Sequence, residues 1–231
     1  MTDRIDISWI KGVLFDLGGT LIEYVNDPPK AVFDDFISQL SEDDPKIVFH
    51  EFSELIDSYW IHMQKEYYSA PESLDIFEYN RQFLIKHGFS DATSQRLSKP
   101  FSDIIFQLEP DGTHLKEGAI ELLDLLKSKN LKLGIITNAS HNEDRIRKIL
   151  SRVGIEKYFE TVVVSSEVGI RKPDPMIFQI ALKNLDLAPE QAIYIGDSFE
   201  YDAQGASNAG MQYVLVSKDF GLNNVAEIFR G

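Results

Sequence analysis

Five short apolar runs rich in β-branched residues stand out in the chain, at residues 12–15, 131–136, 161–164, 192–195 and 212–216. These runs are too short for helices and lack the polar alternation of a half-exposed sheet, so they predict strands buried on both faces. Helical spacing of apolar residues precedes each of the last four runs, over residues 115–126, 143–153, 175–185 and 200–209. Alternating strands and helices predict an α/β fold, in which a parallel sheet carries helices on both faces.

The stretch between the first and second predicted strands follows a different pattern. Apolar residues recur every three or four positions from Phe52 to Tyr67, as on one face of a long helix, and no convincing strand interrupts the region. A connection of roughly ninety residues is too long for a loop within one sheet. We therefore expect residues 27–113 to form an inserted all-helical domain, and residues 1–26 and 114–231 to form the α/β core. Aromatic residues such as Tyr59 and Trp60 are expected mainly to build the core of the insertion.

Composition narrows the classes of function. The 231 residues include no cysteine, and 23 Lys and Arg against 37 Asp and Glu give a net charge of −14. Nucleic acids and anionic membranes would repel such a chain, so we expect neither as a partner. The absence of cysteine excludes disulfides and thiolate metal sites, as is typical of cytoplasmic proteins. No apolar stretch approaches the ~20 residues of a membrane span, and the acidic start is unlike a signal peptide, so we expect a cytoplasmic location.

Polar residues follow the ends of the predicted strands. The residues concerned are Asp16, Thr137, Asn138, Lys172, Asp197 and Asp202. Each of them alone is compatible with an ordinary turn or helix cap. However, the carboxyl ends of parallel strands meet at one edge of a sheet, where ligands bind. Carboxylates suit a divalent cation, and lysine and hydroxyl donors suit phosphate oxygens, so the set predicts a site for both.

Four motifs carry these residues in order. They are Phe15-Asp16-Leu17-Gly18-Gly19-Thr20-Leu21, Ile136-Thr137-Asn138, Lys172-Pro173-Asp174-Pro175, and Ile195-Gly196-Asp197-Ser198 followed by Asp202. In these motifs the chain resembles, over about residues 11–217, the haloacid dehalogenase-like hydrolase superfamily, in the branch with a helical cap inserted after the first motif. Most members of this superfamily are phosphatases. The resemblance implies a Rossmann-like sheet of order 3-2-1-4-5, a Mg²⁺ cofactor and a small phosphorylated substrate.

The resemblance also implies which residues carry out catalysis and bind phosphate. Asp16 would be the nucleophile that takes the phosphoryl group, and a covalent intermediate divides one difficult displacement into two easier ones. Lys172 and Thr137 would donate hydrogen bonds to the transferring group, and Asn138 would add its amide nearby.

By the same resemblance, three groups would bind Mg²⁺: the carboxylates of Asp16 and Asp197 and the backbone carbonyl of Gly18. Asp202 would orient the lysine that neutralises the transferring group. The sequence does not indicate the substrate or the oligomeric state.

The chain departs from the family pattern at Gly18. Family phosphatases have there a second aspartate, which protonates the leaving group and later activates water. A glycine keeps the carbonyl for the metal but loses this acid/base, a function worth about 10²–10⁴-fold in rate. We expect slow turnover, with aryl and acyl phosphates affected less than sugar phosphates because their leaving groups need no proton. Glu23 and His141 are candidates, by position only, to replace the missing carboxylate.

Two other functions use the same features. Dehalogenases of the superfamily also lack an aspartate at the position of Gly18, so a metal-independent 2-haloacid dehalogenase is one alternative. Those enzymes need no metal, whereas Asp197 keeps a metal-binding carboxylate, which favours phosphate chemistry. The other alternative is a catalytically weak sensor or scaffold that binds phosphate and Mg²⁺. Residues 23–27 and 111–113 are candidate hinges of the cap, because turn-forming residues cluster there.

Overall fold

The computed structural model describes residues 7–24, 30–42, 44–67, 75–111 and 113–230. The chain divides into two compact units. The first consists of residues 1–23 and 114–231 and contains a five-stranded sheet, and the second consists of residues 24–113 and is built from helices. Each unit is described by itself.

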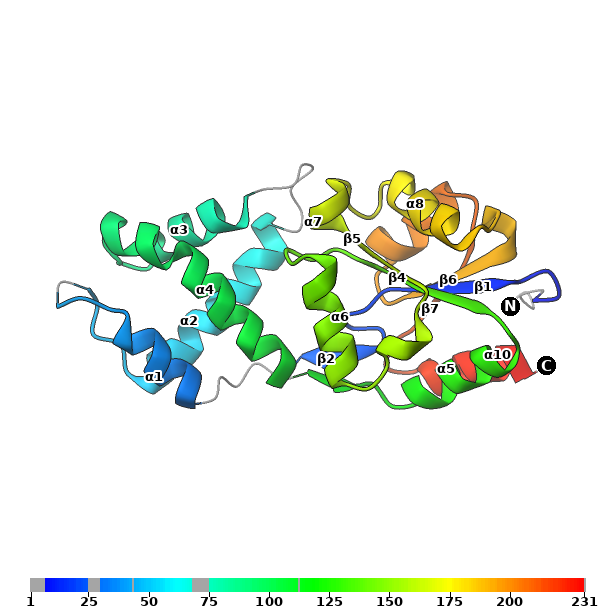
Figure 1. Cartoon of the computed structure of the whole chain (residues 1–231), viewed down its shortest axis with the longest axis horizontal. Helices are drawn as coiled ribbons and strands as arrows, with labels where there is room; N and C mark the ends of the chain where they lie inside the picture. The colour runs from blue at the N-terminus through cyan, green and yellow to red at the C-terminus, as the bar shows by residue number, and fades with distance from the viewer. Residues whose placement is uncertain (1–6, 25–29, 43, 68–74, 112, 231) are drawn as a thin grey trace. The chain divides into compact units, whose positions relative to one another are not determined.

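The sheet of the first unit is entirely parallel (Figure 1). Its strands are β1 (Gly12–Phe15), β4 (Lys132–Thr137), β5 (Thr161–Val164), β6 (Ala192–Gly196) and β7 (Gln212–Leu215). They are arranged in the order β5-β4-β1-β6-β7, which confirms the predicted order 3-2-1-4-5. Strand β1 lies at the centre, where Phe15 pairs with Ile135 on one side and with Ile195 on the other. All residues of β1, β5 and β6 are buried, which explains the unbroken apolar runs in the sequence.

Helices flank both faces of this sheet (Figure 1). The longer ones are α5 (Ala119–Ser128), α6 (Glu143–Arg152), α8 (Pro175–Leu185) and α10 (Leu222–Arg230). Shorter elements are α7 (Ser165–Val168), α9 (Gln204–Asn208) and the turns η2 (Glu156–Tyr158), η3 (Pro189–Gln191) and η4 (Phe199–Ala203). In Figure 1, α8 lies above the sheet and α5 and α10 lie below it. Apolar faces of α8 and α9 pack on β4, β5 and β6, and this packing forms a core of aliphatic and aromatic side chains.

Four elements differ from the sequence prediction. Strands β2 (Ile22–Tyr24) and β3 (Thr113–Leu115) form a two-stranded sheet that was not expected, because three residues are too few to show a periodic pattern. The helix expected over 115–126 begins only at Ala119, after Gly118 in a left-handed conformation. The helix expected over 200–209 begins as the π-helical turn η4. Within the proposed hinges, residues 25–27 and 112 lie outside the described residues.

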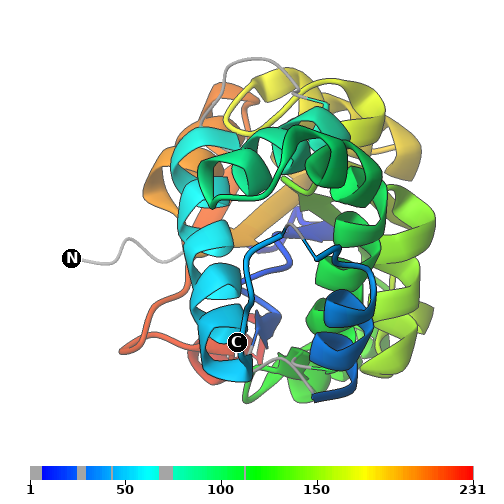
Figure 2. The ribbon, with the colours of Figure 1, turned by 90° about the vertical axis from the view of Figure 1, so that its left-hand side faces the viewer.

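The second unit has its own apolar core. Its helices are the blue to green ribbons of Figure 2. It comprises α1 (Lys30–Ser38), α2 (Phe49–His62), the π-helical turn η1 (Met63–Tyr67), α3 (Ile76–Lys86) and α4 (Asp91–Asp111). Tyr59 and Met63 are buried on the predicted apolar face, and Trp60 packs beside them. The Tyr59 ring lies edge-on to Phe83 and Phe101, with centroids 5.1 and 5.2 Å away. In the described part of the chain, no helix has the length and apolar character that a membrane span needs.

Candidate active site

Asp16 lies at the carboxyl end of the central strand, where the backbone turns sharply. Its backbone N–H donates to the carbonyl of Ile195 over 2.9 Å, and the residue is 7% exposed. The carbonyl of Leu17 accepts from the N–H groups of the next turn, and Gly19 takes a φ of +82°. A Cβ atom on Gly19 would lie 2.3 Å from Oδ2 of Asp197. Glycine is therefore needed at position 19 to let this turn approach Asp197.

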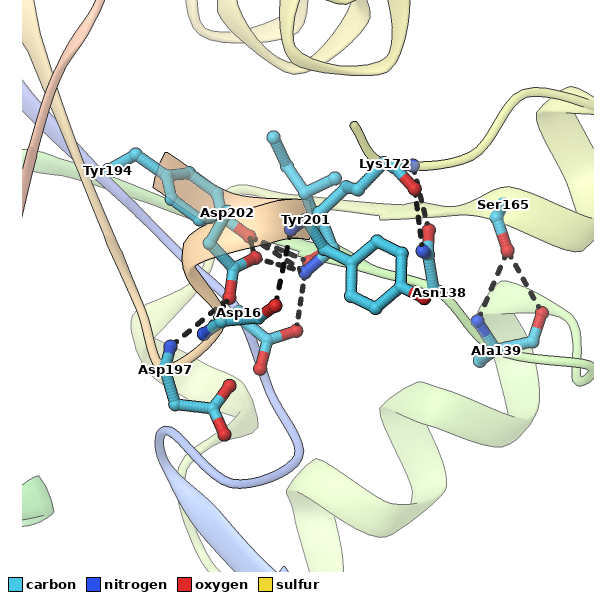
Figure 3. A network of polar contacts seen from close by, with 11 residues as sticks. Asp16, Asn138, Ala139, Ser165, Lys172, Tyr194, Asp197, Tyr201 and Asp202 are labelled. Atoms are coloured by element: carbon cyan, nitrogen blue, oxygen red, sulfur yellow. Dashed lines mark hydrogen bonds and ion pairs between the residues drawn. The ribbon is translucent and has the colours of Figure 1, made fainter. Parts of the chain in front are cut away.

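Lys172 brings three side chains together around its ammonium group (Figure 3). Its Nζ lies 2.7 Å from Oδ1 of Asp16 and 2.6 Å from Oδ1 of Asp202. The hydroxyl oxygen of Tyr194 lies 3.0 Å from the same nitrogen. All four residues are at least nine-tenths buried, so this ion pair network is shielded from water. Buried charges need such pairing, since removing them from water costs several kcal/mol per ion.

The charges in the network shift one another's pKa values. Burial raises the pKa of Asp16 to about 6, although the neighbouring ammonium of Lys172 opposes the shift. Burial alone would lower the pKa of Lys172, but the carboxylates of Asp16 and Asp202 raise it above its usual value. The pKa of Asp197 is raised as well, first by reduced contact with solvent and then by the negative charge of Asp202. The crowding of carboxylates around one lysine leaves an excess of negative charge that a cation would neutralise.

The carboxylate of Asp202 is fixed by hydrogen bonds to both of its oxygens. Its Oδ2 accepts from the backbone N–H groups of Asp197 and Ser198 over 3.1 and 2.9 Å, and its Oδ1 is bonded by Lys172 and Tyr194. A carboxylate accepts about four hydrogen bonds, so when Tyr194 donates its hydrogen to Asp202, that carboxylate has no oxygen lone pair left for a metal.

The residues fit a Mg²⁺ ion. One oxygen from each of Asp16, Asp197 and Asp202 lies within 4.8 Å of the other two. With Asp202 saturated, Asp16 and Asp197 supply the hard oxygen ligands that Mg²⁺ prefers, and Asp197 is exposed to solvent. Gly18, whose carbonyl was predicted as a third ligand, belongs to the same turn and forms an isolated bridge with Ile22. The structure thus brings Asp16 and Asp197 close together, and their role as metal ligands remains a prediction.

Asn138 and Thr137 lie where β4 ends beside β1. The side chain of Asn138 forms two hydrogen bonds with the backbone of Lys172. Its Nδ2 donates to the Lys172 carbonyl over 3.0 Å, and its Oδ1 accepts from the Lys172 N–H over 2.9 Å. Asn138 therefore fixes the segment that carries the lysine. Thr137 is the last residue of β4 and is buried. Phosphate binding by these two residues remains a prediction.

Three residues of this region were not predicted as site residues. Tyr194 was hidden in an apolar strand, where a single hydroxyl leaves the pattern unchanged. Ser165 fixes the loop after β4. Its Oγ accepts a hydrogen bond from the N–H of Ala139 and donates one to the carbonyl of Ala139, both over 3.2 Å. Lys116 donates to the carbonyl of Gly19 over 2.8 Å and pairs with the candidate Glu23 at 3.3 Å. No sequence motif marks these contacts, because they join segments far apart in the chain.

The other candidate for the missing acid/base is buried. His141 is 7% exposed, and its backbone carbonyl accepts from Ser166 Oγ over 2.6 Å. Replacement by Glu23 or His141 of the carboxylate missing at Gly18 stays a prediction.

Comparison with known proteins places the chain in a family. Residues 10–210 match the family model of the haloacid dehalogenase-like hydrolases. The chain belongs to this family. The family match confirms the resemblance that the four motifs indicated.

Two relatives of this haloacid dehalogenase-like hydrolase are named glyceraldehyde 3-phosphate phosphatase. The protein of Pyrococcus furiosus is 30% identical over 210 residues, which are 89% of this chain and 80% of that protein. The protein of Methanothermobacter thermautotrophicus is 41% identical over 98 residues, but this match spans only 42% of the length of each. The match with the higher identity thus covers less than half of the chain, and the match that covers most of the chain has the lower identity.

Solved structures share the fold. A 2-haloacid dehalogenase from Pseudomonas syringae pv. Tomato DC3000 superposes with a TM-score of 0.67, covering 96% of this chain and 98% of that one. The two sequences are only 21% identical, so this likeness concerns the fold and does not decide between dehalogenase and phosphatase chemistry.

Proposed function

We propose that this hydrolase is a phosphatase that removes phosphate from small phosphorylated compounds by way of a phosphoryl group on Asp16. The observation that carries the proposal is the buried contact between Asp16 and Lys172, with Asp197 beside it. A nucleophilic carboxylate next to a fixed cation suits the transfer of a charged phosphoryl group, for which electrostatic stabilisation is the main requirement. The names of the relatives support the same reaction class.

In the first step an oxygen of Asp16 attacks phosphorus. A bond forms between that oxygen and phosphorus, and the bond from phosphorus to the leaving oxygen breaks. The leaving oxygen keeps the electron pair of the broken bond and takes a proton from water. Lys172, 2.7 Å from Asp16, holds a positive charge where negative charge gathers on the phosphoryl oxygens.

In the second step a water molecule attacks phosphorus and releases Asp16. The bond from phosphorus to the Asp16 oxygen breaks, inorganic phosphate leaves, and the water gives its proton to the solvent or to the phosphate itself. Lys172 pairs again with the freed carboxylate, which restores the arrangement in Figure 3.

Mg²⁺ held by Asp16, Asp197 and the carbonyl of Gly18 would supply positive charge to the phosphoryl oxygens. Other residues would support the Mg²⁺ site without binding the ion themselves. Asp202 fixes the backbone on either side of the Asp197 Cα through two N–H contacts, and Gly19 lets the first turn close over the Asp197 carboxylate. We propose that these contacts hold the two carboxylates at the spacing that one cation can bridge.

The glycine at position 18 determines the turnover rate and the class of leaving group that we expect for this enzyme. The missing acid/base would cost about 10²–10⁴-fold in rate, or roughly 3–5 kcal/mol in the barrier. Enzymes accelerate phosphate monoester hydrolysis by up to ~10²¹-fold, so a deficit of this size slows the reaction without abolishing it. We propose that the physiological substrate has a leaving group that departs readily as an anion or that carries its own proton donor. We also propose that residues 27–113 act as the cap domain typical of the family.

The test is a panel of aryl, acyl, sugar and nucleotide phosphates assayed with Mg²⁺ and with a chelator, alongside a 2-haloacid. The proposal expects Mg²⁺-dependent phosphate release that is fastest for aryl and acyl phosphates and is lost in Asp16→Asn. Chelator-insensitive release of halide would establish the dehalogenase alternative instead. Thermal stabilisation by Mg²⁺ and phosphate without any turnover would establish the sensor or scaffold alternative.

A further inference from the structure

The ammonium group of Lys172 has three hydrogens, and three acceptors surround it. Two of these acceptors are Oδ1 of Asp16 and Oδ1 of Asp202, at 2.7 and 2.6 Å. The third is the hydroxyl oxygen of Tyr194, at 3.0 Å, which belongs to none of the four motifs. Each hydrogen of the ammonium group can therefore be assigned to its own acceptor, and Tyr194 completes the set.

The position of the Tyr194 hydroxyl is narrowly restricted by packing. The residue is fully buried in β6, and the ring of Phe178 lies edge-on to it with centroids 4.9 Å apart. Phe178 is itself confined, since a Cβ atom on Gly205 would lie 2.4 Å from its ring. A buried ring packed on a second buried ring has little freedom to move its hydroxyl group.

Tyr194 contributes an acceptor without adding a charge. Its own hydroxyl hydrogen can be donated to Oδ1 of Asp202, at 3.1 Å, or to the carbonyl of Ile136, at 3.3 Å. Burial and the nearby carboxylates raise the pKa of Tyr194 well above its usual value, so the hydroxyl stays neutral. A third carboxylate in its place would raise the negative charge around Lys172 from two to three, and a phenylalanine would leave one ammonium hydrogen without its acceptor.

We propose that Tyr194 is a positioning residue that, together with Asp202, aims the remaining hydrogen of the Lys172 ammonium group at Asp16. The inference rests on the proposed function, because Asp16 is where the phosphoryl group would be attached. Charge on the oxygens of the transferring phosphoryl group is greatest in the transition state. A tilted ammonium group therefore stabilises the transition state less well, and substrate binding is affected less. Loss of the hydroxyl should therefore lower kcat and leave KM nearly unchanged.

The test compares Tyr194→Phe with Tyr158→Phe. Tyr158 is a matched control, because it is a buried tyrosine of the same unit whose hydroxyl donates to Oδ1 of Asp124 over 2.7 Å. With Mg²⁺ and an aryl phosphate, Tyr194→Phe is expected to lower kcat about 10-fold, as the loss of a hydrogen bond to a charged group should, with KM within about 2-fold. Tyr158→Phe should keep both constants. In a crystal structure of Tyr194→Phe, the Lys172 ammonium group should lie farther from Asp16.

An unchanged kcat in Tyr194→Phe would overturn the inference, and so would an equal fall in both variants or a change in KM alone. If the wild-type protein hydrolyses no phosphate ester at all, the proposed function fails, and the crystal structure of the variant decides the inference. In that case an unmoved contact between Lys172 and Asp16 refutes the positioning role, and a displaced ammonium group supports it.

Discussion

At the scale of single residues, the properties of the site come from charges that are buried close together. Asp16 and Asp202 share one lysine, and neither can be removed without leaving Lys172 less well neutralised. Breaking such a pair from one side is costly, because the remaining charge stays buried. In the proposed mechanism, Asp16 would therefore be in place before any substrate arrives, so that little reorganisation would be needed in the first step.

The first prediction concerns Gly18, where the family pattern has an aspartate. Gly18→Asp should raise the turnover of alkyl phosphates by about 10-fold or more, because a carboxylic acid can then protonate the leaving oxygen. Aryl phosphates should gain much less, since their leaving groups need no proton. The measurement is kcat on one alkyl and one aryl phosphate, with Gly18→Asn as a control of equal size without an ionisable group. Equal gains on both substrates, or the same gain in Gly18→Asn, would contradict the explanation.

The second prediction concerns Gly19, where an added side chain would have two effects: strain in the backbone and a clash with Asp197. Gly19→Ala places a Cβ atom 2.3 Å from Oδ2 of Asp197 at a φ of +82°. Gly154→Ala imposes the same kind of strain at a φ of +80°, but with nothing within 4 Å of the new atom. Both variants should lose about 1–2 kcal/mol of unfolding free energy. Only Gly19→Ala should also lose stabilisation by Mg²⁺ and at least about 10-fold in kcat/KM, measured by thermal shift and steady-state kinetics.

Among the site residues, those that lie in motifs could be predicted and those that act through tertiary contacts could not. Asp16, Lys172 and Asp202 were predicted, and the structure brings both carboxylates within hydrogen-bonding distance of the Lys172 ammonium group. Tyr194 was not, because its hydroxyl meets Lys172 from a strand that reads as wholly apolar. Asn138 was predicted near phosphate, yet its described contacts are to the backbone of Lys172, which no spacing rule reveals.

At the scale of elements, regular strands and helices were predictable and short connections were not. Strands β1, β5 and β6 coincide with apolar runs that are buried on both faces of the sheet, whereas the order of the strands was implied by the family resemblance. Strands β2 and β3 escaped prediction because each has three residues, and the hydrogen bonds between them depend on tertiary folding. The π-helical turn η4 was expected as ordinary helix, since its sequence has the same spacing of apolar residues.

The third prediction concerns the segment before α2 in the helical unit. Asp44 is 5% exposed, and its Oδ2 accepts from the N–H and Oγ of Ser41 and from Oγ1 of Thr93, at 2.7 to 2.9 Å. Burial alone would raise the pKa of Asp44, but these hydrogen bonds lower it below its usual value of 3.8. A carboxyl whose pKa is lowered by folding stabilises the fold above its unfolded pKa, and this contribution is lost as the pH falls through the folded value.

Asp44→Asn should therefore lower the free energy of unfolding by about 1–3 kcal/mol at neutral pH. The difference from the wild-type protein should shrink as the pH falls below about 4, because the carboxyl becomes protonated first in the unfolded chain and, at lower pH, in the folded protein as well. Urea unfolding of both proteins at several pH values measures this difference. Asp34→Asn is the control, because Asp34 is exposed and paired only with the exposed Lys30 among the contacts that the structure describes. A difference between wild type and Asp44→Asn that is constant with pH would show that the carboxylate charge is unimportant.

At the scale of the whole molecule, the acidic composition and the proposed substrate have to be reconciled. The chain carries a net charge of −14, yet a phosphate ester is an anion. Lys172 supplies one buried positive charge at Asp16, and a Mg²⁺ ion at Asp16 and Asp197 would supply the rest. Attraction of substrate is thus expected to be local, so that chelation should weaken phosphate binding as well as turnover.

The central claim is that Asp16 becomes covalently phosphorylated. The most direct measurement is to mix the protein with Mg²⁺ and an aryl phosphate, quench with acid within one turnover, and map the peptides by mass spectrometry. We expect one phosphoryl group on the peptide that contains Asp16, no such adduct in Asp16→Asn, and loss of turnover in that variant. Steady release of phosphate with the adduct on another residue, or undiminished turnover in Asp16→Asn, would contradict it.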